Sequence, residues 1–114
     1  MSFTSNQPKN ISVIICHGDL NAHTMIRLKH TLSRLIGQKR RRIVLDLAKA
    51  KHVDFSGLCI LIERLQKVRS LRGDIRVINI QPEVSKAFES VGVHKMIESF
   101  ESKHEAIRSF QVVA

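Results

Sequence analysis

Residues 42–69 of the chain read RIVLDLAKAKHVDFSGLCILIERLQKVR, and this stretch decides the fold. Its first part, Arg42 to Leu47, is a run of aliphatic and β-branched residues, which predicts a buried strand. Its second part predicts an amphipathic helix that begins at Ser56-Gly57, with Ser56 as the N-cap. The inward positions of this helix are Leu58, Leu61, Ile62, Leu65 and Val68. A strand that leads through a loop into such a helix is half of a βαβ unit, which indicates a parallel sheet.

The same alternation of strand and helix continues on both sides of this stretch. Strands are predicted at residues 11–16, 74–80 and 96–100, and helices at 21–37, 82–92 and from Ser102 onward. Asn21 is a predicted N-cap, Pro82 suits a first helical turn, and Ser102 with Glu105 forms a capping box. The third helix is expected to bury Val84, Ala87, Phe88 and Val91. The sequence therefore predicts an α/β fold, a small mixed, mostly parallel sheet of about four to five strands packed against about four helices.

The length of 114 residues is enough for one domain and too short for two ordinary ones. Residues 1–10 are expected to form a polar segment, with a short edge strand as one option, and residues 11–114 the single domain. No apolar run approaches the ~20 residues that cross a bilayer, and the first residues lack the layout of a secretory signal. Cys16 and Cys59 lie in apolar stretches without metal-ligand spacing, which favours a reduced, cytoplasmic protein.

The net charge is strongly positive. Nineteen Lys and Arg residues against ten Asp and Glu residues give a formal net charge of +9. The excess centres on a basic run, Lys39, Arg40, Arg41 and Arg42, between the first predicted helix and the second strand. Such a run is usually a solvated turn, but it can also attract an acidic protein, an anionic membrane surface or nucleic acid. Because the chain has no Trp or Tyr to stack on bases, nucleic-acid binding is an alternative of another class and not the favoured function.

Two loops, residues 18–21 and 51–57, follow the carboxyl ends of neighbouring predicted strands. Parallel strands would place both loops on one rim of the sheet, where α/β proteins usually form their binding surfaces. The residues expected on this partner-binding surface are Asp19, Asn21, Asp54, Phe55, Ser56, Gly57 and Glu63. The sequence shows no spacing typical of a catalytic triad, a phosphate-binding glycine loop or a histidine metal site. We therefore expect a binding protein without enzymatic activity, cofactor or metal.

Four motifs in this order resemble the STAS domain of bacterial anti-sigma-factor antagonists, and the resemblance covers about residues 11–110. The motifs are Gly18-Asp19-Leu20-Asn21, Asp54-Phe55-Ser56-Gly57-Leu58, Arg72-Gly73 and Val91-Gly92-Val93. The resemblance implies a STAS fold and a partner-switching role. The antagonist would bind an anti-sigma factor that has a histidine-kinase-like ATPase fold, and so free the sigma factor. That kinase would end the interaction by phosphorylating a Ser or Thr hydroxyl of the antagonist. A STAS subunit of a transport or lipid-handling complex, near a membrane surface through its partner, is the alternative within the same family.

The sequence departs from the family pattern at the phosphate acceptor. The resemblance places the acceptor directly after the loop aspartate, and Phe55, which has no hydroxyl, occupies that position. Ser56 matches the family's second hydroxyl position, which leaves it open as a helix cap or a phosphorylation site. Asn21 stands where the family usually has an aspartate. Phe55 is either an exposed anchor for a partner or an ordinary core residue. We therefore expect a protein that binds its partner without the usual phosphorylation switch.

Overall fold

The computed structural model describes residues 2–7 and 11–111. In chain order these residues form β1 (Ser2–Gln7), β2 (Ile11–Ile15), α1 (Ala22–Gly37), β3 (Arg42–Asp46), α2 (Phe55–Ser70), β4 (Asp74–Ile78), α3 (Pro82–Ser90), β5 (Ser99–Phe100) and α4 (Lys103–Gln111). The strands form one sheet in the order β1-β2-β3-β4-β5. Strands β2 to β5 are parallel, and β1 pairs antiparallel with β2 at one edge. The predicted fold class is confirmed, and the edge strand that the sequence left as an option is present.

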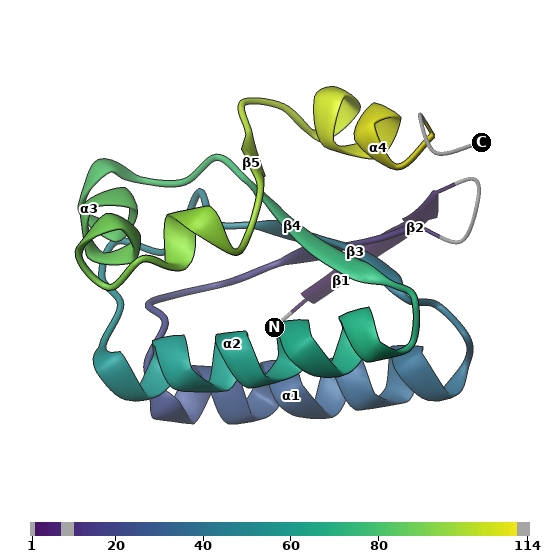
Figure 1. The fold of residues 1–114 in the computed structure, drawn as a ribbon, viewed down its shortest axis with the longest axis horizontal. Coiled ribbons are helices and arrows are strands. Elements are labelled where there is room, and N and C mark those ends of the chain that lie inside the picture. Colours follow the sequence, from purple (N-terminus) through teal and green to yellow (C-terminus); the bar gives the residue numbers. More distant parts are fainter. Residues whose placement is uncertain (1, 8–10, 112–114) are drawn as a thin grey trace.

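Helices cover both faces of the sheet (Figure 1). Helices α1 and α2 lie on one face, α4 lies on the other, and α3 packs at one end. Strand β3 shows how the sequence builds these layers, because successive side chains point to opposite faces. Ile43 and Leu45 belong to the main core with α1 and α2, whereas Val44 packs in a second core with Ala106 and Phe110 of α4. Burial on both faces explains why the strands read as continuous apolar runs.

The third predicted strand, residues 74–80, is shorter in the structure. Strand β4 ends at Ile78, since Asn79 has a φ of 56° in the left-handed region, which ends regular pairing. Strands β2 and β3 each end one residue earlier than predicted.

The segment after α3 differs more from the prediction. The predicted strand at 96–100 is reduced to Ser99–Phe100, because Gly92, with a φ of 80°, leads into a short 3₁₀ turn at Val93–Lys95. Val93 is buried there. The expected burial of Val91 is wrong, since its side chain is 49% exposed. Of the capping box predicted for α4, one bond is present in the described residues, with the Glu105 amide donating to Ser102 Oγ at 3.2 Å.

Candidate docking surface

The two loops of the predicted rim are joined directly to each other. Leu20 and Val53 form a parallel bridge beyond the ends of β2 and β3. The Leu20 amide donates to the His52 carbonyl at 2.9 Å, and the Leu20 carbonyl accepts from the Asp54 amide at 3.0 Å. The pairing of β2 with β3 therefore continues into the loops. The prediction that both loops lie on one rim is correct.

Asp19 ties its own loop to the loop after β3. Its Oδ1 accepts hydrogen bonds from the backbone amides of Lys51, at 3.0 Å, and His52, at 3.1 Å. These two bonds favour the charged carboxylate and hold the pKa of Asp19 below its ordinary value. Asp19 is thus a structural clamp of the rim, whatever else it contacts.

Asn21 caps α1 as the sequence predicts. Its Oδ1 accepts from the Thr24 amide at 3.0 Å, and Thr24 Oγ1 accepts from the Asn21 amide at 3.1 Å. The side-chain amide of Asn21 therefore replaces a carboxylate without loss of the cap. Its role in the structure is to set where α1 begins.

The expected N-cap of α2 is wrong. The cap is Asp54, whose Oδ1 accepts from the Gly57 amide at 2.7 Å, and whose backbone is extended. The helix begins at Phe55, one residue before the predicted start, so Ser56 lies inside the first turn. Both residues are suitable caps by type, and the extended backbone of Asp54 decides between them. The exposed Ser56 hydroxyl makes no hydrogen bond to the part of the chain that the structure describes.

Gly57 is buried and lies against the first loop, so it is not part of the exposed surface. A Cβ at this position would collide with the backbone carbonyl group of Leu20. The missing side chain lets α2 start directly on top of the Leu20 loop. Gly57 therefore belongs to the architecture of the rim, and the expectation that it contacts a partner is not supported by its burial.

Phe55 is exposed, so the core position that the sequence left open is wrong. Its side chain is 71% accessible at the first position of α2. Cys59 follows one turn later on the same helix and is also exposed. The Phe55 ring leaves most of its apolar surface open to solvent. Phe55 therefore places an exposed aromatic ring at the edge of the rim.

Glu63 links this helix to its neighbour. It pairs with Lys29 of α1 at 3.7 Å and with Arg64 at 2.7 Å. The hydrogen bond from Arg64 and the charge of Lys29 lower the pKa of Glu63. The pair with Lys29 is exposed and contributes little stability, but it shows which turns of α1 and α2 lie side by side.

A small apolar patch follows from this alignment. One turn towards the rim from Lys29 lies Ile26, which is 48% exposed, and one turn from Glu63 lies Cys59. Helices α1 and α2 run in the same direction and pack together (Figure 1). Ile26, Cys59 and Phe55 therefore share the outer surface of the two helices next to the rim. We call these three residues the rim patch.

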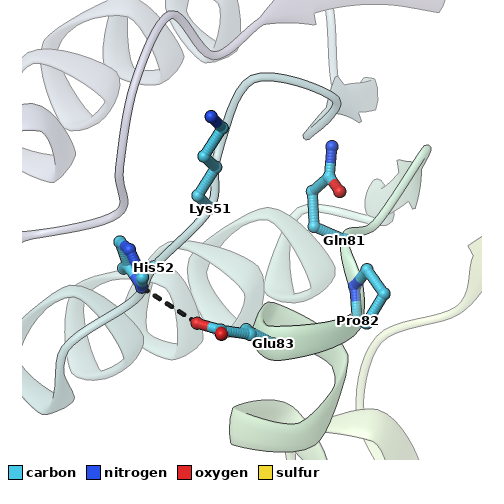
Figure 2. Close-up of a pocket in the computed structure, with 5 residues that line it drawn as sticks. All are labelled: Lys51, His52, Gln81, Pro82 and Glu83. Carbon is cyan, nitrogen blue, oxygen red and sulfur yellow. Dashed lines mark ion pairs between the residues drawn. The ribbon is translucent and has the colours of Figure 1, made fainter.

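A shallow hollow of about 390 Å³ lies beside the second loop (Figure 2). Lys51 and His52 line it from the loop before α2, and Gln81, Pro82 and Glu83 line it from the start of α3. His52 Nδ1 lies 3.1 Å from a carboxylate oxygen of Glu83, and both side chains are largely exposed. No pattern in the sequence connects these two residues, which only the fold brings together.

The basic run is not the solvated turn that the sequence suggested. Arg40 Nε donates to the buried Ser12 hydroxyl at 3.0 Å, and its Nη2 donates to the Ile11 carbonyl at 3.3 Å. Arg40, Arg41 and Arg42 are half-buried, and Lys39 is the exposed residue of the run. The run lies at the amino end of β3, opposite the rim. The partial burial of its three arginines shows that the run packs against the fold.

Two absences hold for residues 2–7 and 11–111. In these residues no group of three or more His, Cys, Asp and Glu side chains could hold a metal ion. Within the same ranges, no helix has the length and apolar character needed to span a membrane.

Comparisons with known proteins agree with this architecture. An anti-sigma F factor antagonist of Paenibacillus polymyxa is 22% identical over 107 residues, covering 93% of this chain and 92% of the relative. The structure of the anti-sigma factor antagonist SpoIIAA in its unphosphorylated form matches 99% of this chain and all of its own, with a TM-score of 0.72 and 17% identity. A sulfate transporter family protein of Wolinella succinogenes matches 92% of this chain and 88% of its own, with a TM-score of 0.81 and 15% identity.

The family assignment rests on nearly the whole chain. The family description that matches is that of the STAS domain, over residues 2–106. This range includes both rim loops, the rim patch and the paired strands β1 to β5. The chain belongs to the STAS domain family.

Proposed function

We propose that this protein is a non-enzymatic, cytoplasmic anti-sigma-factor antagonist. It docks through the rim patch and the two rim loops onto an anti-sigma factor that has a histidine-kinase-like ATPase fold. The kinship with anti-sigma-factor antagonists supports the kind of partner. The observation that carries the proposal is the exposure of Phe55 beside the rim.

Phe55 has the chemistry of an interface anchor. A large aromatic side chain that is 71% exposed gains apolar burial when a partner covers it. The residue sits on a helix start that is fixed by the Asp54 cap and the Leu20 contacts, so it is held in place before binding. Aromatic residues in such positions are often the dominant contributors to an interface.

The same residue removes the usual release mechanism. Phosphate at the acceptor position would bring a charge near −2 into the interface, where desolvation and repulsion weaken binding. Phe55 cannot accept phosphate, so the protein stays competent to bind in the presence of the kinase and ATP. Ser56 is the remaining hydroxyl of the first turn, and its exposure makes it the position to check for modification.

Affinity capture tests this proposal with native cell extract and three forms of the full chain. The wild type is expected to recover an anti-sigma factor with the histidine-kinase-like fold, and Phe55→Ala is expected to lose it. Val91→Ala is the matched control, because Val91 is also an exposed apolar residue but lies after α3, outside the rim patch. Equal recovery by all three forms would refute docking through Phe55.

A second candidate is favoured by the similarity to the Wolinella succinogenes sulfate transporter family protein. In this alternative the chain is a STAS subunit of a transport or lipid-handling complex. Recovery of a transporter protein in the same capture, in place of a kinase-like protein, would support it. Recovery of nucleic acid alone would support the alternative that the protein binds nucleic acid through the basic run.

A further inference from the structure

Four arginines surround one hollow at the end of the sheet opposite the rim. The hollow has a volume of about 270 Å³ and is lined by Arg42, Arg69, Arg72, Gly73, Asp74, Arg76 and Phe110. Arg42 and Asp74 are paired first residues of β3 and β4, so the hollow lies at the amino ends of these strands. The docking loops follow the carboxyl ends of β2 and β3, at the other end of the sheet. The two sites are therefore separate.

The backbone brings the arginines together. Arg69 is in the last turn of α2, and Arg72 is in the tight turn to β4 with a φ of 67°. The next residue is Gly73, where a Cβ would collide with the carbonyl oxygen of Arg41. The turn therefore packs directly on the residue that precedes β3. This close approach places Arg72 beside Arg42.

Asp74 orients two of the guanidinium groups. Its Oδ1 accepts from Arg69 Nε at 2.9 Å, and its Oδ2 accepts from Arg76 Nε at 3.1 Å. The guanidinium of Arg76 also lies 4.0 Å above the ring centre of Phe110 and hydrogen-bonds the Ser109 hydroxyl. The side chain of Arg76 is only 12% exposed. These contacts hold the guanidinium groups of Arg69 and Arg76 in fixed positions.

The charges in the hollow do not balance. The guanidinium groups of Arg69, Arg72 and Arg76 surround the carboxylate of Asp74, which leaves an excess of two positive charges among these four side chains. Like charges held this close repel each other, and partial burial strengthens the repulsion. The Arg72 side chain makes no hydrogen bond or ion pair within the described residues. An anion in the hollow would offset this repulsion.

We infer that this hollow binds a small phosphorylated anion. The planar guanidinium group matches a phosphate geometrically and binds it through paired, charge-assisted hydrogen bonds. The volume lies below the ~300 Å³ at which pockets for drug-sized ligands begin, which suits a phosphomonoester or diphosphate group and not a whole nucleotide. The phosphate can belong to a soluble compound or to a lipid headgroup. The inference goes beyond the proposed docking function and does not rest on it.

Calorimetric titration of the full chain with pyrophosphate at low salt tests the site. The wild type is expected to bind at one saturable site, and Arg72→Gln is expected to weaken binding at least about tenfold. Arg108→Gln is the matched control, since it removes one exposed positive charge from α4 without lining the hollow. The control is expected to change the affinity by less than about twofold.

Amide chemical shifts of the wild type provide a second measurement that needs no variant. Pyrophosphate is expected to shift the Gly73 and Arg76 amides and to leave the Leu20 and Asp54 amides unchanged. Heat that does not saturate, equal weakening by both variants, or shifts confined to the rim would overturn the inference.

Vesicle sedimentation distinguishes a soluble phosphate compound from a lipid headgroup as the source of the phosphate. Phosphatidylcholine vesicles that contain phosphatidic acid are sedimented with the protein, with and without pyrophosphate. If the protein binds the vesicles, and if both pyrophosphate and Arg72→Gln reduce that binding, the site is assigned to a lipid headgroup. Pyrophosphate binding without vesicle binding assigns it to a soluble phosphate. Because neither measurement involves the docking partner, their failure would leave the proposed function untouched.

Discussion

The two ends of the parallel sheet share one backbone arrangement but carry different side chains. At the carboxyl end, Gly57 packs on the Leu20 carbonyl group, and the exposed aromatic ring of Phe55 lies two residues before this contact. At the amino end, Gly73 packs on the Arg41 carbonyl group, and the surrounding side chains are arginines. A glycine in each case brings a helix or turn against a neighbouring backbone. The comparison teaches that shared backbone geometry fixes where a site lies, and the flanking side chains decide what it binds.

Substitution of the two glycines is the strongest test of these close backbone contacts. Gly57→Ala is expected to lower the free energy of unfolding by about 3 kcal/mol, because the added methyl overlaps the Leu20 carbonyl group. Gly73→Ala is expected to have an effect of similar size at the other end, where it overlaps the Arg41 carbonyl oxygen. Urea unfolding measures both.

Gly37→Ala is the control for these variants, because open space surrounds its position in α1. It is expected to leave the free energy of unfolding unchanged or to raise it by up to ~1 kcal/mol. If Gly57→Ala behaved like Gly37→Ala, the close contact between α2 and the first loop would be wrong.

Phe55→Ser tests whether the absence of a hydroxyl at position 55 prevents phosphorylation of the rim. The new hydroxyl would follow the Asp54 cap at the start of α2, where free amides and the helix dipole favour a phosphate group. An antagonist kinase with ATP is expected to phosphorylate this variant, and phosphorylation is expected to weaken partner binding at least about tenfold. Mass spectrometry and calorimetry measure the two effects.

The wild type serves as the control and should gain little or no phosphate. Stoichiometric phosphate on Ser56 of the wild type would show that the acceptor has moved by one residue, and that the protein keeps its switch. The fold of Phe55→Ser should be unaffected, since the ring is mostly exposed.

The revised cap of α2 predicts a difference between two neighbouring residues. Asp54→Ala is expected to lower the free energy of unfolding by about 1 kcal/mol, because it removes the bond to the Gly57 amide. Ser56→Ala is expected to change it by less than about 0.5 kcal/mol, since the hydroxyl has no partner in the described chain. Thermal or urea unfolding measures both, and a reversed order would restore Ser56 as the cap.

The smallest expected effect concerns the free energy of unfolding at acidic pH. The pKa of Asp19 is lowered in the folded state, so its carboxylate stabilises the fold above its ordinary pKa of 3.8. That contribution is lost as the pH falls through the lower folded-state pKa. In Asp19→Asn the loss of stability between neutral and acidic pH is expected to be smaller, as measured by urea unfolding at several pH values. An unchanged pH profile would contradict the clamp.

The fold and the rim were predictable from sequence because they depend on patterns that are local. Alternating strands and helices imply parallel pairing, and parallel pairing places successive loops at one end. The cap of α2 was not predictable, since Asp54 and Ser56 are both suitable and only the backbone distinguishes them. The exposure of Phe55 was equally open, because aromatic residues are usually buried.

The arginine hollow and the burial of the basic run depend on distant partners. Arg40 reaches Ser12, 28 residues earlier, and Arg76 lies over Phe110 of the last helix. A charge run in the sequence carries no sign of such contacts. Positions that join distant segments therefore need the folded structure before their role can be read.

The Leu20 bridge has a consequence for binding thermodynamics. Both backbone polar groups of Leu20 are paired with the second loop, and its side chain is only 2% exposed. The two loops therefore have little conformational freedom left to lose when a partner covers them. Since the ordering of loops opposes association, a rim that is ordered in the free protein keeps more of its contact energy as affinity. In the proposed docking, the rim would bind its partner as a nearly rigid surface.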